Sequence, residues 1–439
     1  MTDLRSRAGS ALLLLALVAL WPKVGSADTA TGGDGGPPPT SAPPDQQGYT
    51  GRLVEAGEPV RGVEIVVETL DGEEVGRDET GRGGTWTVAV AQPGRYRITI
   101  DTDTLPDGVE LTDPTRTVFE VDAFPGRLST VLFELGEREG GRGPNLAERL
   151  AQSSTNGLKF GLIIAMASIG LSLIFGTTGL INFAHGELVT LGAIVAWFLN
   201  ARGPRWQLIV AAVVAAAICG LIGGALERGV WRSLRVRQVG LFQLFVITIG
   251  LSLIIRHVLL IWFGGTRRGY LDYRIQRQWD VGPVSITPRD LTIMAASVVI
   301  LVAVATMLQR TRMGKAMRAV ADNVDLSEAS GVDVQRVILA VWIMGAALAA
   351  IGGIFLGSIE SVDWQMGTRM LLLMFAAVIL GGLGTAYGAM VGGIIVGLVT
   401  EISTIWAPSA LKLVFALAAL VLALLVRPQG ILGRAERVG

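Results

Sequence analysis

The sequence predicts a polytopic α-helical membrane protein of about nine spans with a small all-β sandwich domain near its N-terminus. Two observations carry this fold class. Half of the 439 residues (51%) are hydrophobic and the mean hydropathy is +0.52, which is high for a soluble protein. The stretch from Thr50 to Arg142 is rich in Glu, Asp and Arg, whereas long apolar runs follow from about Leu158. The chain therefore combines a polar N-terminal region with a membrane region.

The first 27 residues have the three zones of a secretory signal peptide. Arg5 and Arg7 provide a positive start, residues 11–20 form a short apolar core, and small residues lead to Ala27. A core of about ten residues is too short to cross a bilayer, so we expect a signal peptide over 1–27 that sends the next residues out of the cytoplasm. An uncleaved anchor is the alternative. Residues 28–47, rich in Gly, Pro, Thr and Ser, predict a flexible tether.

Residues 48–136 predict a small extracytoplasmic β-sandwich. Apolar residues alternate with polar ones along three short segments separated by turn dipeptides such as Asp71-Gly72 and Gly83-Gly84. The inward-facing sets are Val63, Ile65 and Val67; Trp86, Val88 and Val90; and Tyr96, Ile98 and Ile100. Trp86 is expected in the core, because residues 88 and 90 on its face are apolar. Residues 137–156 are expected to be a linker.

The membrane domain is expected over 157–439. Nine apolar segments are candidate spans, several near the ~20 residues that a spanning helix needs. Abundant glycines, such as Gly392-Gly393 and Gly397, predict helices that approach one another closely. The segments are Leu158–Gly179, Glu187–Ala201, Trp206–Leu226, Leu241–Gly264, Leu291–Leu308, Val337–Leu356, Met370–Leu383, Ala389–Ser403 and Ala410–Val426.

The distribution of basic residues predicts the orientation. With the sandwich outside, nine spans place the C-terminus in the cytoplasm of a multi-pass protein of the cell (plasma or inner) membrane. The basic stretches at 228–237 and 310–318 and the basic tail then lie inside, as the positive-inside rule requires. The loop 266–290 carries five arginines and falls outside, which disagrees with the rule.

A polar motif, GLINFAHGELV at 179–189, interrupts two apolar runs. Asn182, His185 and Glu187 are costly in lipid and usually face a cavity or one another. One interpretation is a polar motif, with Gly186, that either fixes a break between two helices or lines a path. The other, which we favour, is a helix cap, with Asn182 capping and Glu187 near the positive helix end. A proton-carrying His185 is a third possibility.

Composition excludes several function classes. The net charge is zero, which does not point to nucleic acid. The single cysteine, Cys219, and two histidines make no standard metal cage, and no nucleophile–base constellation is present, so we predict no metal site, no catalytic residues and no enzyme. No GxxxxGK[ST] motif occurs, so this chain has no nucleotide cofactor of its own.

Three segments carry a family resemblance: GLIIAMASIGLSLIFGTTGLINFAHGELVTLGAIVAWFL (161–199), TRMGKAMRAVADNVDLSEASGVDVQRVILAVWIMGAALAAIGGIFLG (311–357) and LLVRPQGILG (424–433). They resemble permeases of high-affinity branched-chain amino acid ABC transporters, in which INFAHGE is a hallmark. Urea permeases of the same superfamily typically have NMAHGE, and Phe183 favours the amino-acid branch. The 57–67 and 84–100 segments resemble the carboxypeptidase-regulatory-like sandwich, an addition that the typical permease lacks.

The resemblance implies a permease subunit that works by alternating access and is driven by separate ATPase subunits, which bind the ATP. The implied partners are a second permease subunit, two ATPase subunits and an extracytoplasmic substrate-binding protein, with an amino acid as substrate.

The coupling element would be residues 311–333. Met313, Met317 and Val320 form an apolar stripe, and a break at Asp322-Asn323 separates a second short helix that ends at Gly331. Two short amphipathic helices suit a groove on a partner. The EASG at 328–331 resembles the coupling loop of importers; the residues assigned to this ATPase-coupling loop are Gly314, Lys315, Arg318, Glu328 and Gly331.

Two alternatives stay open. A urea or short-chain amide ABC permease of the same superfamily fits the same motifs. An autonomous secondary transporter is less favoured, because the span interiors offer few charged residues beyond Arg256 and Glu401. A surface protein whose sandwich does the work would not need nine spans.

Overall fold

The computed structural model describes residues 47–433 apart from 56–57, 93, 107, 114–115, 124–127, 137–144, 274–275 and 277. The expected signal peptide, and all of the expected tether except Gln47, lie outside the described residues. The described residues divide into two units, one before the gap at 137–144 and one after it. Each unit has its own hydrophobic core.

The first unit consists of short β-strands. One sheet has the strand order β6-β1-β9, a second has the order β5-β4-β7-β8, and β2 pairs with β3. All pairings are antiparallel except that of β1 with β9. The strands are β1 (Gln47–Arg52), β2 (Val54–Glu55), β3 (Glu58–Pro59), β4 (Glu64–Thr69), β5 (Glu74–Glu79), β6 (Thr85–Val90), β7 (Gly94–Ile100), β8 (Val118–Ala123) and β9 (Leu128–Thr130).

Both sheets contribute to one core. All nine side chains expected to face inward on β4, β6 and β7 or directly before β4 are buried, and Trp86 is 1% exposed. The Tyr49 hydroxyl donates a hydrogen bond of 2.7 Å to the carbonyl oxygen of Val121. Gly72 and Gly84 have φ values of 89° and 70°, so the two turns predicted there use the left-handed conformation that glycine tolerates.

The second unit is a helical bundle with one small hairpin. Its helices are α2 (Leu146–Thr178), α3 (His185–Trp197), α4 (Leu208–Leu226), α5 (Arg232–Val236), α6 (Leu241–Phe263), α7 (Pro288–Arg310), α8 (Arg312–Asp322), α9 (Val324–Ala329), α10 (Val334–Ile359), α11 (Met366–Gly381), α12 (Ala386–Ile402) and α13 (Lys412–Val426). Short π-helical segments extend α3 (Phe198–Arg202) and join α4 to α5 (Glu227–Trp231). The hairpin is β10 (Trp279–Val281) with β11 (Val284–Ile286).

Seven of the described helical segments are long and apolar enough to cross a membrane. They contain α2, α4, α6, α7, α10, α12 and α13. The sequence predicts about nine spans. The two predicted spans that are not among these seven correspond to α3 and α11, which have 13 and 16 residues. The π-helical segment Phe198–Arg202 continues α3, and both α3 and α11 start inside the bundle, where their first turns meet at Gly186 and Gly367.

α2 begins earlier than expected. Residues 146–156, predicted as part of a linker, form its first turns. The helix starts there because Asn145 and Glu148 form a capping box: the Asn145 side chain accepts from the Glu148 N–H at 2.9 Å, and the Glu148 carboxylate accepts from the Asn145 N–H at 2.9 Å. The Asn-x-x-Glu pattern was readable in the sequence, and it extends α2 to 33 residues.

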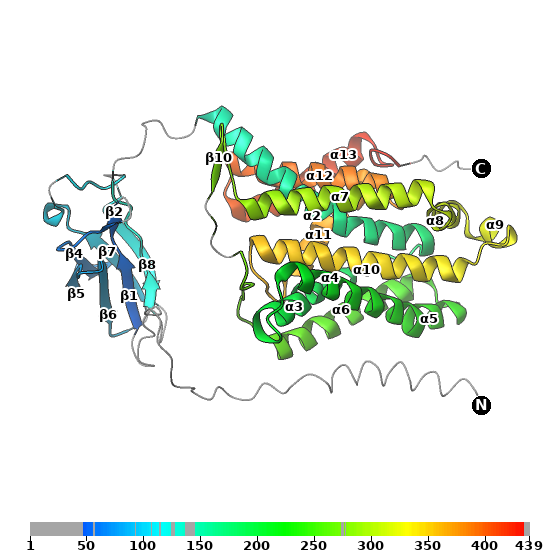
Figure 1. Ribbon diagram of the computed structural model, residues 1–439, viewed down its shortest axis with the longest axis horizontal. Helices are drawn as coiled ribbons and strands as arrows, with labels where there is room; N and C mark the ends of the chain where they lie inside the picture. Colours follow the sequence, from blue (N-terminus) through cyan, green and yellow to red (C-terminus); the bar gives the residue numbers. More distant parts are fainter. Residues whose placement is uncertain are drawn as a thin grey trace. The chain divides into compact units, whose positions relative to one another are not determined.

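α2 forms the centre of the bundle and packs against α10, α11 and α12. Glycines permit this contact, as predicted: a Cβ on Gly397 would lie 2.2 Å from the Cα of Gly161, and one on Gly170 would lie 2.6 Å from the Cα of Gly345. Figure 1 shows that α8 and α9 lie at one end of the bundle and the hairpin at the other. We call these the α8–α9 end and the hairpin end.

Candidate functional site

A polar break separates α2 from α3. α2 ends at Thr178 because Gly179 adopts a left-handed conformation (φ 68°) and its N–H bonds to the Phe175 carbonyl oxygen at 2.7 Å. The hydroxyl of Thr178 turns back to the carbonyl oxygen of Ile174 at 2.6 Å. Asn182 then accepts, through Oδ1, the N–H of Ala184 at 3.0 Å. These local hydrogen bonds replace the regular backbone hydrogen bonds of a helix over residues 179–184.

The break returns the chain into the bundle. His185, the first residue of α3, places its Nε2 3.2 Å from the carbonyl oxygen of Ala167. Ala167 lies about three turns before the end of α2, which is roughly 16 Å back along that helix at about 1.5 Å per residue. The segment 179–184 therefore runs back alongside α2, and α3 starts deep inside the bundle rather than at its edge.

Glu187 forms a buried ion pair in the first turn of α3. Its Oε1 atom accepts from Arg256 Nε at 3.1 Å and Nη2 at 2.9 Å, from the Ser252 hydroxyl at 3.0 Å and from the Thr368 hydroxyl at 3.2 Å. The Glu187 side chain is fully buried and that of Arg256 is 20% exposed. One carboxylate oxygen thus ties α3 to α6 and α11, three helices far apart in the sequence.

α11 begins at the same place as α3. A Cβ on Gly367, in the first turn of α11, would lie 1.9 Å from the carbonyl oxygen of Gly186, so the two backbones are in contact. The N–H of Gly367 donates to the Thr190 hydroxyl at 3.0 Å. We call this meeting of two short helices, with Glu187 and Arg256, the polar junction. The positive ends of two helix dipoles face one carboxylate there, which is a favourable arrangement.

Three buried polar atoms of the motif have no hydrogen-bond partner among the described residues. They are Asn182 Nδ2, His185 Nδ1 and Glu187 Oε2. An unsatisfied buried polar atom typically costs about 1–3 kcal/mol. Polar groups kept at such a cost inside a membrane bundle are candidates for function.

The helix-cap interpretation of the motif is correct in part. Glu187 lies in the first turn of α3, where the helix dipole favours it. Asn182 does not cap α3, since the residue before the helix is Ala184 and no side chain caps it. Arg256 was visible as a charged residue inside a span, but its pairing with Glu187 was not predicted. Ser252 and Thr368 carry no sequence signal, because hydroxyl residues are common in such helices.

The segment 311–333 forms two short helices, α8 and α9, as predicted. Asn323 ends α8 and caps α9, accepting from the Leu326 N–H at 2.9 Å. Gly331 follows α9 with φ 84°. Lys315 and Arg318 are exposed, and Leu326 is an exposed apolar residue (66%). An exposed leucine on α9 and exposed cations on α8 suit a contact with another protein.

The apolar stripe on α8 differs from the prediction by one residue. Met317 and Val320 are buried, whereas Met313 is 40% exposed and Gly314 takes the buried position. Gly314 packs against the end of α7, where a Cβ would lie 2.5 Å from the Cα of Leu308. Only a residue without a side chain fits so close to α7, so the helix turns Met313 outward.

A cavity of about 540 Å³ joins the helix break to α8 and α9. Glu328 lines it, as do the arginines of α5, but Glu187 does not. Glu328 therefore shares a cavity with residues 176–179 at the end of α2. The ion pair of Glu187 with Arg256 lies outside this cavity. The lining includes residues 176–179, 320–324 and 334–335, with Arg232, Arg235, Val236, Glu328 and Ile338.

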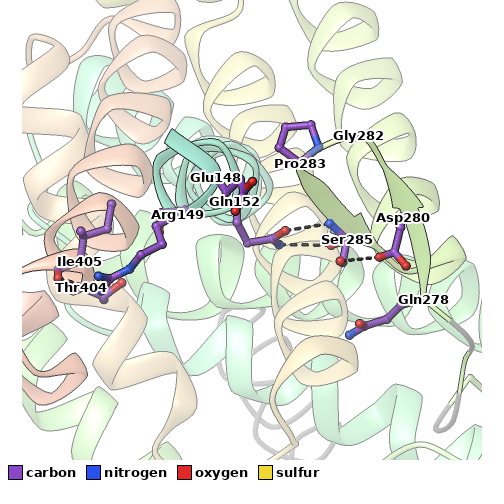
Figure 2. A pocket seen from close by; sticks show the side chains of 11 residues that line it. Glu148, Arg149, Gln152, Gln278, Asp280, Gly282, Pro283, Ser285, Thr404 and Ile405 are labelled. Carbon is purple, nitrogen blue, oxygen red and sulfur yellow. Dashed lines mark hydrogen bonds between the residues drawn. The ribbon is translucent and has the colours of Figure 1, made fainter. Parts of the chain in front are cut away.

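A second cavity, of about 670 Å³, lies at the hairpin end and has a polar lining. Figure 2 shows that the Gln152 side chain of α2 points to Ser285 of β11. The Gln152 amide bonds to the Ser285 backbone twice, at 2.8 and 3.1 Å, which pairs the hairpin with the first turns of α2. On the other side, Arg149 donates to the carbonyl oxygen of Ile405 at 3.1 Å. The sequence did not indicate this cavity.

The described residues contain no group of three or more His, Cys, Asp or Glu side chains that could hold a metal ion. What the site offers instead is a set of packed short helices, a buried ion pair and a cavity that reaches an exposed helical pair. The cavity is lined both by the end of α2 and by residues of α8 and α9.

Comparisons with known proteins identify the family of the membrane unit. The model of the family "branched-chain amino acid transport system / permease component" matches residues 153–424. The high-affinity branched-chain amino acid transport system permease protein LivH of Escherichia coli K12 is 32% identical over 300 residues, covering 65% of this chain and 96% of LivH. The corresponding protein BraD of Pseudomonas aeruginosa is 27% identical over 299 residues, with the same coverage.

More distant proteins also match. The ribose import permease protein RbsC of E. coli K12 is 26% identical over 264 residues, covering 58% of this chain and 75% of RbsC. Among solved structures, PsaBC from Streptococcus pneumoniae in complex with Fab covers 62% of this chain and 91% of its own, with 13% identity and a TM-score of 0.35. A likeness of that size carries no argument about function.

Proposed function

Because the chain belongs to the family of branched-chain amino acid transport system permease components, we propose that it is the membrane subunit of an ABC importer for branched-chain or related amino acids. The observation that carries this proposal is the family match over residues 153–424, which includes the polar junction and the α8–α9 pair. Members of the family are permease components and not enzymes. The sequence has no P-loop, so separate ATPase subunits would bind the ATP.

The complete importer would contain a second permease subunit, two ATPase subunits and an extracytoplasmic substrate-binding protein. The chain would be a multi-pass protein of the cell membrane with its C-terminus in the cytoplasm. A signal peptide (1–27), a tether (28–47) and a carboxypeptidase-regulatory-like sandwich (48–136) would precede the membrane domain. The α8–α9 end would then be cytoplasmic, and the polar cavity at the hairpin end would face the binding protein.

Energy would enter through α8 and α9. Exposed Lys315, Arg318 and Leu326 supply charge and an apolar anchor for a groove on an ATPase subunit. Movement of α9 would change the cavity that Glu328 lines together with the end of α2. Glu328 and the left-handed Gly331 would therefore couple ATPase closure to the break at 179–184.

The polar junction would act as the gate of the permease. α3 and α11 start against one another there, and the ion pair of Glu187 with Arg256 holds α6 to both helices. Packed elements of this kind exchange between discrete arrangements instead of deforming smoothly. Alternating access would separate these helices in one arrangement and close them in the other.

Uptake by the reconstituted importer tests the proposal. Vesicles that contain this chain, its ATPase and permease partners and the binding protein should accumulate a branched-chain amino acid only with ATP. Glu328→Ala should lower uptake at least severalfold, with normal membrane insertion, because Glu328 lines the cavity. Asp325→Ala is the matched control, since Asp325 is an exposed carboxylate of the same helix outside that cavity.

Two results would contradict the proposal. Accumulation of solute by the purified chain alone, without any ATPase, would show a secondary transporter. Unchanged uptake by Glu328→Ala would remove the coupling role of α9 while leaving the family assignment intact.

A further inference from the structure

The RPQGILG motif at 427–433 forms a short non-helical segment after α13. α13 ends at Val426, and the segment turns at Gly430, which is buried and has a φ of 78°. Ile431 packs against the hydrophobic core of the helical unit. This segment, which we call the C-terminal strap, is therefore part of the packed bundle.

The strap completes the end of α11. A helix leaves its last four carbonyl oxygens without partners inside the helix. The N–H of Gly382, the residue after α11, bonds to the first two of these oxygens. In the strap, the N–H of Ile431 donates to the Leu380 carbonyl oxygen at 2.9 Å. The N–H of Leu432 donates to that of Gly381, also at 2.9 Å. The strap thus serves the last two carbonyl groups of α11.

Glycines bring the strap into backbone contact with α11. A Cβ on Gly430 would lie 2.6 Å from the nitrogen of Gly382. Conversely, a Cβ on Gly382, which has a φ of 113°, would lie 2.5 Å from the nitrogen of Gly433. Backbones approach this closely only where no side chain intervenes. The end of α11 is therefore fixed by the strap through both hydrogen bonds and steric contact.

The turn that follows α11 holds the end of α2. A Cβ on Gly176, in the last turn of α2, would lie 2.9 Å from the Gly384 carbonyl oxygen and 3.5 Å from the Cβ of Ala321 on α8. The Ser172 hydroxyl donates to the Thr385 carbonyl oxygen at 3.1 Å. The end of α2 thus lies between this turn and α8, and it lines the cavity that α8 and α9 also line.

α11 extends from the strap to the polar junction. It has 16 residues, so it is roughly 24 Å long at about 1.5 Å per residue. In its first turn, Gly367 contacts the backbone of Gly186. The next residue, Thr368, donates its hydroxyl hydrogen to Glu187 at 3.2 Å. One helix therefore has its first turn in the polar junction and its last turn in the strap.

We propose that the C-terminal strap is a positioning element for transport, with Gly382 and Gly430 as its central residues. By fixing the end of α11 and the turn beside it, the strap makes α11 follow the end of α2 when α8 and α9 move. Coupling between distant sites is carried by packed elements in contact, and these contacts form such a series. The inference rests on the proposed function and gives it a second coupling element. Without the strap, ATP hydrolysis would continue while the polar junction stayed closed.

The ratio of amino-acid uptake to ATP hydrolysis, measured in vesicles with the assembled importer, tests this role. Gly430→Ala should lower the ratio at least fivefold, while ATP hydrolysis falls less than twofold. Gly72→Ala is the matched control, because Gly72 also has a positive φ (89°) but a Cβ there would have no atom within 4 Å. The ratio should be unchanged in this control. A purely structural effect of Gly430→Ala would lower uptake and hydrolysis together and would overturn the inference.

A second pair of variants tests the hydrogen bonds of the strap. Leu432→Pro removes the N–H that bonds to Gly381, whereas Leu432→Ala keeps it, and the side chain of Leu432 is 47% exposed. Only the proline variant should lower the ratio of uptake to hydrolysis. If the parent importer transports and the ratio is unchanged in Gly430→Ala and Leu432→Pro, the strap has no positioning role. Absence of ATP-dependent uptake by the parent importer would instead contradict the proposed function.

Discussion

Replacement of Glu187 by glutamine tests the central role of the ion pair. Glu187→Gln keeps the size of the side chain and removes its charge, so Arg256 is left at the same depth without a counter-ion. The converse change, Arg256→Met, leaves a fully buried carboxylate without its cation. Each single change therefore strands one charge inside the bundle.

The expected loss follows from the geometry. Arg256 Nε and Nη2 lie 3.1 and 2.9 Å from Glu187 Oε1, which places the charge centres about 4 Å apart. At an effective dielectric constant of about 20, that pair attracts by about 4 kcal/mol. Removal of one partner of a buried pair typically costs about 3–5 kcal/mol, whereas removal of both can be nearly neutral. The double variant should therefore be more stable than either single variant.

A double-mutant cycle on the full chain measures this coupling. The free energy of unfolding would be determined in mixed detergent micelles for the parent chain, the two single variants and the double variant. We expect the double variant to lose about 3 kcal/mol less than the sum of the two single losses. The pair of Lys159 with Asp290, at 2.9 Å and with both side chains 12% exposed, is the control and should show a smaller coupling.

Additive effects would refute the reasoning. If the two single variants each lost less than about 1 kcal/mol, the pair would behave like a surface ion pair. The Glu187 carboxylate would then not hold α6 to α3 and α11, and the gate assigned to the polar junction would lose its basis.

Three further predictions follow from other parts of the chain. Gly367→Ala should destabilise the bundle by at least about 1–3 kcal/mol in the same unfolding assay, because the added Cβ would lie 1.9 Å from the Gly186 carbonyl oxygen. Gly250→Ala is the control and should be tolerated, since a Cβ on Gly250 would have no atom within 4 Å. Leu326→Ser should leave stability unchanged but lower co-purification of the ATPase subunits, since Leu326 is 66% exposed; equal recovery would exclude Leu326 as an anchor. Burial, aided by Tyr96 and Asp122, raises the pKa of the Tyr49 hydroxyl to about 12. The neutral phenol should therefore contribute its full share to the free energy of unfolding below the unfolded pKa of about 10, and this contribution should be lost as the pH rises through 12. Absorbance titration of phenolate in the full chain and in Tyr49→Phe measures this, and a difference spectrum with a midpoint near 10 would contradict it.

Local patterns in the sequence were sufficient for much of the fold. The alternation of apolar residues placed Val63, Trp86 and Tyr96 in the β core, since a strand exposes one face and buries the other. Apolar length located the membrane helices, because the hydrocarbon core requires about 20 residues. Asn323 and Gly331 marked the ends of short helices, because capping and left-handed turns depend on nearby residues.

The tertiary structure alone decided which elements meet. Glu187 and Arg256 are both visible as costly residues in lipid, but their pairing depends on how α3 and α6 pack. The depth at which α3 and α11 begin, and the exposure of Met313, were set by close backbone contacts at Gly367 and Gly314. The periodicity of a single helix indicates which of its sides is apolar but does not identify the helix that packs against that side. Long-range contacts of this kind are therefore known only from the packed bundle.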